Sequence, residues 1–200
     1  MNRLGVDLVA LTGDYVTSGV AFHADIAAVL TDFAAKDGTF AVMGNHDYFG
    51  NGEPLVTLLR DGGVKVLRNE HVTLERGTDR MHVAGVDDTW TRRADVARTV
   101  ESCSSGTPIV ALAHDPKLFP ELARRGASLV LSGHTHWGQI AVPFAAARLN
   151  LSRASRYRYH AGLYSEDGST LYVNPGLGTT GPPIRFGAPP EITIFRLRAA

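Results

Sequence analysis

The chain has 200 residues, of which 44% are hydrophobic and 20% are charged, a composition typical of a globular domain with enough apolar side chains for a buried core. Its formal net charge is zero, and it has no basic run of the kind that marks a nucleic-acid binder. No stretch reaches the length of a membrane span. The single cysteine, Cys103, excludes an internal disulfide, has no partner at zinc-finger spacing, and is expected to be a partly buried small residue.

Apolar strand-like runs alternate with helix-like stretches through the first two-thirds of the chain. In chain order, we predict strand 6–11, helix 21–35, strand 39–43, helix 53–60, strands 64–67, 71–74 and 81–86, helix 94–102, strand 108–113, helix 118–125 and strand 128–131. Helix 21–35 is expected to place five apolar residues on one side: Phe22, Ile26, Val29, Leu30 and Phe33.

The pattern changes after residue 136, where only strands are predicted. Segments 162–164 and 171–174 indicate a hairpin around 166–168, and residues 191–196 alternate as a closing strand. Together with the alternation before it, this pattern predicts an α/β fold built as a layered two-sheet sandwich flanked by helices.

Four of the predicted strands each end in a short polar cluster. The clusters are Gly13-Asp14, Gly44-Asn45-His46-Asp47, His114-Asp115 and Gly133-His134-Thr135-His136. Ligands in α/β proteins gather beyond the carboxyl ends of strands, so the four clusters are expected to converge. A carboxylate, an amide oxygen and imidazoles suit Mn, Fe or Zn better than Ca or Mg.

The spacing within these clusters fits a metal site. In an extended segment, His134 and His136 would face the same way because they are two residues apart. The glycines allow tight turns and a close approach of the backbone to a metal. Asp14 has two carboxylate oxygens and can bridge two cations, and two neighbouring metals can clamp the attacking and leaving oxygens of a phosphoryl displacement.

In their order along the chain, Leu-Thr-Gly-Asp, Gly-Asn-His-Asp, His-Asp-Pro and Ser-Gly-His-Thr-His resemble the motif series of calcineurin-like metallophosphoesterases. Segments 138–140, 176–178, 183–187 and 190–192 resemble the bacterial branch grouped with UDP-2,3-diacylglucosamine pyrophosphatases and membrane-lipid phosphohydrolases. The resemblance implies one domain over residues 1–200, with a four-layer fold. It also implies hydrolysis of phosphoester or pyrophosphate bonds by a metal-activated water at a binuclear site.

The resemblance also implies a role for each matching residue. Asp14 would bridge two metals, with Asn45, His114 and His134 completing one site and His136 belonging to the other. His46 would act as an acid, or as a stabiliser of charge, near the leaving oxygen. Asp47 would orient His46 through a hydrogen bond, while Thr135 and Asp115 would have weaker supporting roles. The expected cofactor is two divalent ions, Mn²⁺ first, with Fe or Zn as alternatives.

The sequence departs from the family pattern in two places. No Asp-x-His motif precedes Asp14, and Asp7 is expected to be a strand-start or edge residue instead. We therefore expect the domain to be incomplete at its N-terminus and to lack an early strand; the alternative is a genuine short form that binds its second metal poorly. The other departure is Trp137, in place of a glycine, which either narrows the pocket and stacks on a substrate or is a half-buried rim aromatic.

Several expectations concern partners and competing functions. We expect a small-molecule or lipid-linked phosphoester substrate, no nucleic acid, and a cytoplasmic protein with possible peripheral membrane contact; the sequence gives no oligomeric state. A basic-aromatic segment could contact a phosphate or a membrane surface, or be a solvated loop: Arg153, Arg156, Tyr157, Arg158, Tyr159 and His160.

The main alternative function is a catalytically weak metal-binding remnant with a structural or regulatory role. Amidohydrolase-type chemistry is disfavoured because such sites usually have His and Asp ligands, whereas the second polar cluster here offers an amide, Asn45.

Overall fold

The computed structural model of the chain describes residues 2–140 and 157–198. The helices are α1 (His23–Thr31), α2 (Glu53–Asp61), α3 (Val96–Val100) and α4 (Phe119–Arg124), with 3₁₀ turns η1 (Asn2–Leu4), η2 (His46–Tyr48), η3 (Pro116–Leu118) and η4 (His136–Gly138). The strands are β1 (Leu8–Leu11), β2 (Gly38–Ala41), β3 (Lys65–Val66), β4 (Glu70–Arg76), β5 (Asp79–Val86), β6 (Ile109–Ala113), β7 (Ala127–Ser132), β8 (Gly162–Glu166) and β9 (Ser169–Val173). None of these described helices is both long and apolar enough to cross a bilayer.

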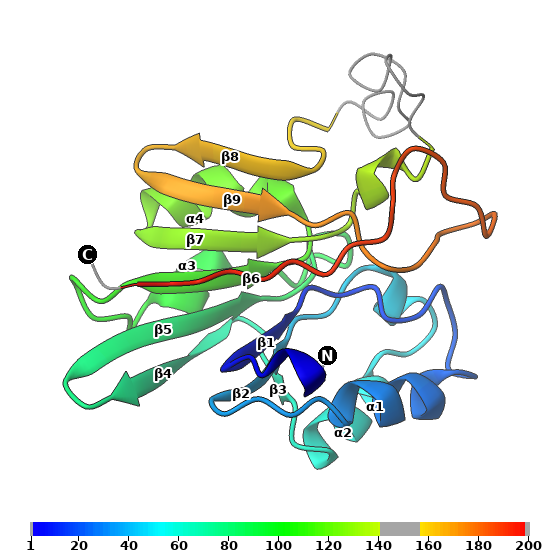
Figure 1. Cartoon of the computed structure of the whole chain (residues 1–200), viewed down its shortest axis with the longest axis horizontal. Coiled ribbons are helices and arrows are strands. Elements are labelled where there is room, and N and C mark those ends of the chain that lie inside the picture. The colour runs from blue at the N-terminus through cyan, green and yellow to red at the C-terminus, as the bar shows by residue number, and fades with distance from the viewer. Residues whose placement is uncertain (1, 141–156, 199–200) are drawn as a thin grey trace.

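The strands form two sheets (Figure 1). The smaller sheet is parallel, in the order β1-β2-β3. The larger has the order β4-β5-β6-β7-β9-β8, with a parallel centre and an antiparallel hairpin at each edge. The hairpin predicted around residues 166–168 is the β8–β9 edge, so that prediction is confirmed.

The two sheets and the helices pack as four layers, because successive side chains of a strand point to opposite faces. Phe40 and Leu112 are fully buried between the two sheets. On the other face of the smaller sheet, Met43 packs with Leu59 and other residues of α1 and α2. On the other face of the larger sheet, Phe119 belongs to the core formed with α3 and α4. The predicted layered α/β fold is confirmed.

Among the predicted elements, the first helix and the closing strand differ most from the structure. Helix α1 is shorter than residues 21–35, and Phe22 and Val29 are more than half exposed rather than part of its buried side. No strand forms over residues 191–196. Side chains hold that segment instead, since Thr193 Oγ1 accepts a 2.8 Å hydrogen bond from Asn174 and Glu191 pairs with the Tyr172 hydroxyl.

The start of the smaller sheet agrees with the prediction for Asp7. This residue lies directly before β1, and its exposed carboxylate pairs with Arg76 at 3.2 Å. Asp7 is therefore an edge residue with an ion-pair partner on β4.

Candidate metal centre

The candidate site lies where β1, β2, β6 and β7 end, so both sheets contribute to it. Asp14 follows β1, Asn45 follows β2, His114 follows β6 and His134 follows β7. The loops after β6 and β7 are joined by a 3.1 Å backbone hydrogen bond from the Gly133 N–H to the carbonyl of His114. Strand ends from four places in the sequence thus meet at one edge of the sandwich, as predicted from the sheet pattern.

Asp14, His114 and His134 form the centre of the site. Nε2 of His114 lies 3.1 Å from Oδ2 of Asp14 and 3.1 Å from Nδ1 of His134. One ligand-type atom from each residue lies within 4.8 Å of the other two. Ligands at about 2.0–2.2 Å from one ion are separated by a little over 3 Å, so this spacing fits a shared cation.

Hydrogen bonds on the far side of two rings fix which nitrogen faces the centre. Nδ1 of His114 donates to the carbonyl of Thr12 at 2.6 Å, which leaves the Nε2 lone pair free. Nε2 of His134 lies 2.8 Å from the Tyr157 hydroxyl, and when it donates there, Nδ1 keeps its lone pair. Backbone carbonyls and hydroxyls commonly orient metal-binding histidines in this way.

At this site, three buried ligand-type atoms have no hydrogen-bond partner in the described part of the chain: Asp14 Oδ2, Asn45 Oδ1 and His136 Nδ1. With its proton on Nδ1, His114 places a second lone pair, not a donor, 3.1 Å from Asp14 Oδ2. Buried polar atoms without partners are costly. Two divalent cations sharing Asp14 would satisfy all three, so the residues present fit metal binding.

The charges of these groups also suit a cation. Burial lowers the pKa of His134 to about 4, helped by the charge of His114, and burial lowers the pKa of His136 as well. Burial opposes ionisation of Asp14 and His114, but the interaction between the Asp14 carboxylate and a His114 ring protonated on both nitrogens outweighs it, lowering the Asp14 pKa and raising the His114 pKa. The site therefore holds the Asp14 carboxylate beside the neutral imidazoles of His134 and His136, the forms that bind metals, and a cation would displace the second proton of His114.

The loops at the site carry a strained backbone. Asp14, His134 and His136 have φ of 57°, 68° and 49°, in the left-handed region that residues other than glycine seldom adopt. Gly44 is required, because a Cβ there would lie 2.2 Å from Oδ1 of Asp14. The premise that His134 and His136 lie in an extended segment is wrong. The chain turns at both residues, with Thr135 bonded to the carbonyl of His160.

Asp47 has a different structural role from the predicted one, which was to orient the ring of His46. Its carboxylate accepts hydrogen bonds from the backbone N–H groups of Asp14 (2.9 Å), Tyr15 (2.7 Å), Val16 (3.3 Å) and Gly44 (2.8 Å). Burial raises the pKa of Asp47 to about 6, against these bonds. Both oxygens are occupied by the loops that carry Asp14 and Asn45, so Asp47 ties those loops together rather than orienting the ring of His46.

The ring of His46 is held by another group. Its Nδ1 lies 2.6 Å from the carbonyl of Thr17, and its ring centroid lies 4.7 Å from that of Phe49. The backbone N–H of His46 donates to Oδ1 of Asp14 at 2.9 Å. His46 therefore lies beside the centre, with Nε2 as the nitrogen able to exchange a proton with a ligand.

Two aromatic residues border His134. Tyr157 bonds its Nε2, and the half-exposed Trp90 has its ring centroid 5.9 Å away. No sequence motif marks Trp90, which follows β5, so it had no predicted role. Tyr157 was included only in the basic-aromatic segment, whose neighbour Tyr159 is a buried core residue.

The other residues singled out in the sequence have structural contacts. Asp115 caps η3 and pairs with Lys117 at 2.8 Å. Arg158 pairs with Glu166 at 2.7 Å, so it is not a free cation for a phosphate. Trp137 is half-buried within η4. Arg153 and Arg156 lie outside the described residues.

The site combines a carboxylate, an amide and imidazoles at the strand ends of a two-sheet α/β sandwich. This combination is typical of the metal sites of metal-dependent hydrolases. The model of the calcineurin-like phosphoesterase family matches residues 1–138, and the chain belongs to this family. The predicted family is thereby confirmed. Membership implies metal-dependent hydrolysis of phosphoester bonds.

Related chains carry names of the same kind. The chain is 32% identical to each of two uncharacterized metallophosphoesterases of Bacillus subtilis, YkoQ and YkuE. The match to YkoQ covers 96% of this chain and 73% of YkoQ, and the match to YkuE covers 100% of this chain and 70% of YkuE. It is 35% identical to one from Helicobacter pylori, over 98% of this chain and 52% of that one. A Danio rerio "Transmembrane protein with metallophosphoesterase domain" is 33% identical, and the chain covers 48% of it.

A solved structure shows the same fold. The SoxB sulfate thiohydrolase of Thermus thermophilus matches 83% of this chain and 33% of its own, with a TM-score of 0.56 and 17% identity. At that identity the likeness concerns the two-sheet architecture alone.

Proposed function

We propose that this chain hydrolyses phosphoester or pyrophosphate bonds with a metal-activated water at a binuclear centre. The observation that carries the proposal is the convergence of Asp14 Oδ2, His114 Nε2 and His134 Nδ1, with 3.1 Å between His114 and each of the other two. The orphaned oxygen of Asn45 and nitrogen of His136 lie on loops of the same site.

The chain's donors divide between two ions. Asp14, Asn45, His114 and His134 would hold one, and Asp14 with His136 would contribute to holding the other. Bound divalent ions would acidify water and neutralise charge on the phosphoryl group. The mixture of imidazole and oxygen donors suits Mn²⁺, with Fe or Zn as alternatives.

The remaining residues of the site would position groups or move a proton. His46 would keep its Nδ1 proton on the Thr17 carbonyl and, when protonated on Nε2 as well, donate that second proton to the leaving oxygen. Asp47 would fix the loops of Asp14 and Gly44. Trp90 and Tyr157, which both contact His134, would border the bound substrate.

The substrate class remains broad. We propose a small-molecule or lipid-linked phosphoester, in keeping with the resemblance to membrane-lipid phosphohydrolases. The relative named as a transmembrane protein supports contact with a membrane surface. The cytoplasmic location and the narrower diacylglucosamine-type substrate stay predictions.

The test is hydrolysis by the chain after its metals are removed with a chelator. We expect no turnover of bis-p-nitrophenyl phosphate or p-nitrophenyl phosphate without metal, and recovery when Mn²⁺ is added. His114→Ala should abolish the recovery. Stoichiometric Mn²⁺ binding with no hydrolysis of either compound or of a pyrophosphate diester would instead favour the metal-binding remnant.

A further inference from the structure

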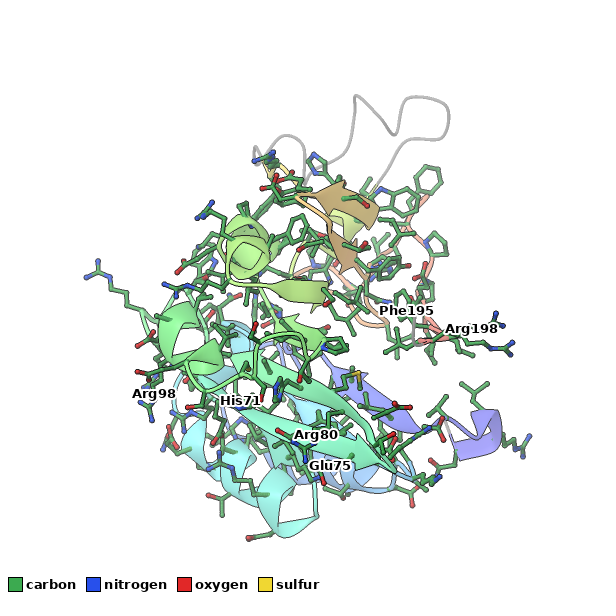
Figure 2. The ribbon with its side chains drawn as sticks, turned by 90° about the vertical axis from the view of Figure 1, so that its left-hand side faces the viewer. His71, Glu75, Arg80, Arg98, Phe195 and Arg198 are labelled. Atoms are coloured by element: carbon green, nitrogen blue, oxygen red, sulfur yellow. The ribbon has the colours of Figure 1, made fainter. Side chains whose placement is uncertain are left out.

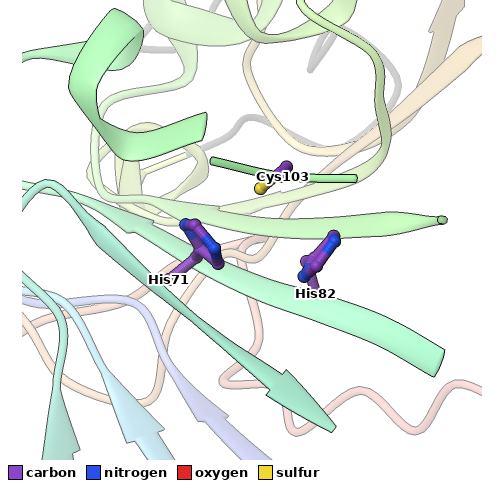
Figure 3. A group of neighbouring side chains, drawn as sticks. All are labelled: His71, His82 and Cys103. Carbon is purple, nitrogen blue, oxygen red and sulfur yellow. The ribbon is translucent and has the colours of Figure 1, made fainter. Parts of the chain in front are cut away.

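A second group of metal-ligand residues lies away from the strand-end site, beside α3. His71 on β4 pairs in register with Ala84, and His82 on β5 pairs with Thr73, so the two histidines are diagonal neighbours across the hairpin. Figure 2 shows His71 on the part of this hairpin next to α3, while Glu75 and Arg80 lie further along it. Cys103 comes from the loop after α3 and lies next to both histidines (Figure 3).

The three side chains are close enough to share one ion. One ligand-type atom of each lies within 4.8 Å of the others, and the two rings meet edge to face with centroids 5.2 Å apart. His82 is 2% exposed, whereas His71 and Cys103 are half-buried. The group is therefore anchored in the fold yet open to solvent on one side.

Hydrogen bonds assign the tautomers of both rings. Nδ1 of His71 lies 3.1 Å from the carbonyl of Thr99, which only accepts, so Nδ1 carries the proton and Nε2 the lone pair. Nε2 of His82 accepts from the Ser104 N–H at 3.0 Å, so its proton is on Nδ1, 3.0 Å from the Thr73 hydroxyl. Each ring thus has its lone pair on Nε2 and a partner fixing Nδ1, as is usual for metal-binding histidines.

We propose that His71, His82 and Cys103 bind a single zinc ion, with water as the fourth ligand. A thiolate with two imidazoles selects a soft or borderline metal such as zinc rather than Mg²⁺ or Mn²⁺. The neighbouring Met81 packs into the core between the sheets, so it adds no thioether on this face. The ion would link β4 and β5 to the segment between α3 and β6.

Binding requires two local changes. The Ser104 N–H must give up Nε2 of His82 to the ion. The Cys103 thiol must release its proton to solvent as the zinc–sulfur bond forms, since burial raises its pKa and keeps it protonated before binding. Burial also lowers the pKa of His82, which keeps that ring neutral and ready to bind.

The test uses Co²⁺ as a spectroscopic probe of the full chain after metal removal. Cobalt bound to a thiolate gives a sulfur-to-metal charge-transfer band, and Cys103 is the only cysteine, so the band can arise from this group alone. We expect the band to saturate with one Co²⁺ at this group, in addition to any Co²⁺ taken up by the strand-end site, to be lost in Cys103→Ser and His71→Gln, and to be displaced by Zn²⁺. His134→Ala, at the other site, should keep the band, and Cys103→Ser should keep the Mn²⁺-dependent phosphoesterase activity.

Alkylation of Cys103 by iodoacetamide gives a second, independent measurement. Zn²⁺ should slow it several-fold in the intact protein, and His71→Gln should remove that protection. A wild-type chain with no charge-transfer band at saturating Co²⁺, or with equally fast alkylation in Zn²⁺, would overturn the proposal. Neither outcome would affect the Mn²⁺-dependent hydrolysis, so the two proposals fail separately.

Discussion

The strand-end group and the hairpin group contain similar residues in different backbone settings. Asp14, His114 and His134 lie in loops after three different strands, two of them at left-handed φ. His71 and His82 lie within two regular neighbouring strands. Both groups bring three ligand-type atoms within 4.8 Å.

The two groups differ most in how their polar atoms are satisfied. At the strand ends, Asp14 Oδ2 and the neighbouring Asn45 Oδ1 are buried without partners in the described part of the chain. In the hairpin, both nitrogens of His82 are already hydrogen-bonded. An ion at the strand ends would give partners to buried atoms that have none, whereas an ion in the hairpin must displace an existing hydrogen bond of His82. We therefore expect the strand-end site to bind its preferred metal more tightly.

Removal of one imidazole ring should have very different effects in the two groups. His134→Ala should lower Mn²⁺ affinity and phosphodiester turnover together, by more than about 100-fold, because even supporting residues of a metal site are worth about 10–100-fold. Metal content per chain and turnover in Mn²⁺ measure the two effects. The matched control is His71→Ala, which should leave both near wild type. Similar losses in the two variants would mean that the hairpin also belongs to the catalytic centre.

Substitution of His46 separates proton transfer from metal binding within the strand-end site. His46→Ala should lower turnover by about 10²–10⁴-fold, the range of general acid catalysis, with Mn²⁺ content almost unchanged. The reason is that its Nδ1 is bonded to Thr17 and its Nε2 is assigned to the leaving oxygen. A loss of metal as large as that in His134→Ala would make His46 a ligand.

Asp47 tests whether the strained loops depend on a buried acceptor. Asp47→Asn puts an N–H₂ where four backbone N–H groups now converge. We expect a loss of about 1–3 kcal/mol in the free energy of unfolding, from unsatisfied donors, and weaker Mn²⁺ binding by about 10–100-fold. Denaturant unfolding and metal titration measure these. Asp25→Asn, at an exposed position on α1, is the control. Equal losses of stability and Mn²⁺ affinity in the two variants would contradict the role of Asp47 in holding the loops together.

The fold was predictable where sequence periodicity and packing agree. Strand β6 (Ile109–Ala113) is buried on both faces, so the uninterrupted apolar run predicted as strand 108–113 marked it correctly. Residues 191–196 alternate like a strand, yet side-chain bonds of Glu191 and Thr193 attach them without a β ladder. Periodicity records which side chains face the protein, and it does not record whether the backbone pairs.

The candidate sites were predictable only where a motif adjoined a strand end. Asp14, His114 and His134 follow apolar runs, and topology brings the ends of such runs together. The carbonyl and N–H partners that set the His46 ring and the Asp47 carboxylate depend on loop geometry, which a sequence motif does not contain. His71, His82 and Cys103 have no motif spacing, because they meet through β-sheet register and the turn after α3.

The Tyr157 hydroxyl supports one ligand of the strand-end site, through its 2.8 Å contact with Nε2 of His134. Tyr157→Phe removes the partner of His134 Nε2, so the tautomer that directs Nδ1 toward His114 is no longer fixed. Three further donors remain for the first ion, so we expect a decrease in Mn²⁺ affinity of only about 10-fold, the lower end for supporting residues of a metal site. Turnover at saturating Mn²⁺ should change less than in His46→Ala, because no proton donor is lost. Tyr172→Phe, whose hydroxyl bonds Thr193 instead, is the matched control. A Tyr157→Phe variant with unchanged Mn²⁺ affinity would show that burial among the strand ends suffices to orient His134, and that the hydroxyl serves the substrate side of the site.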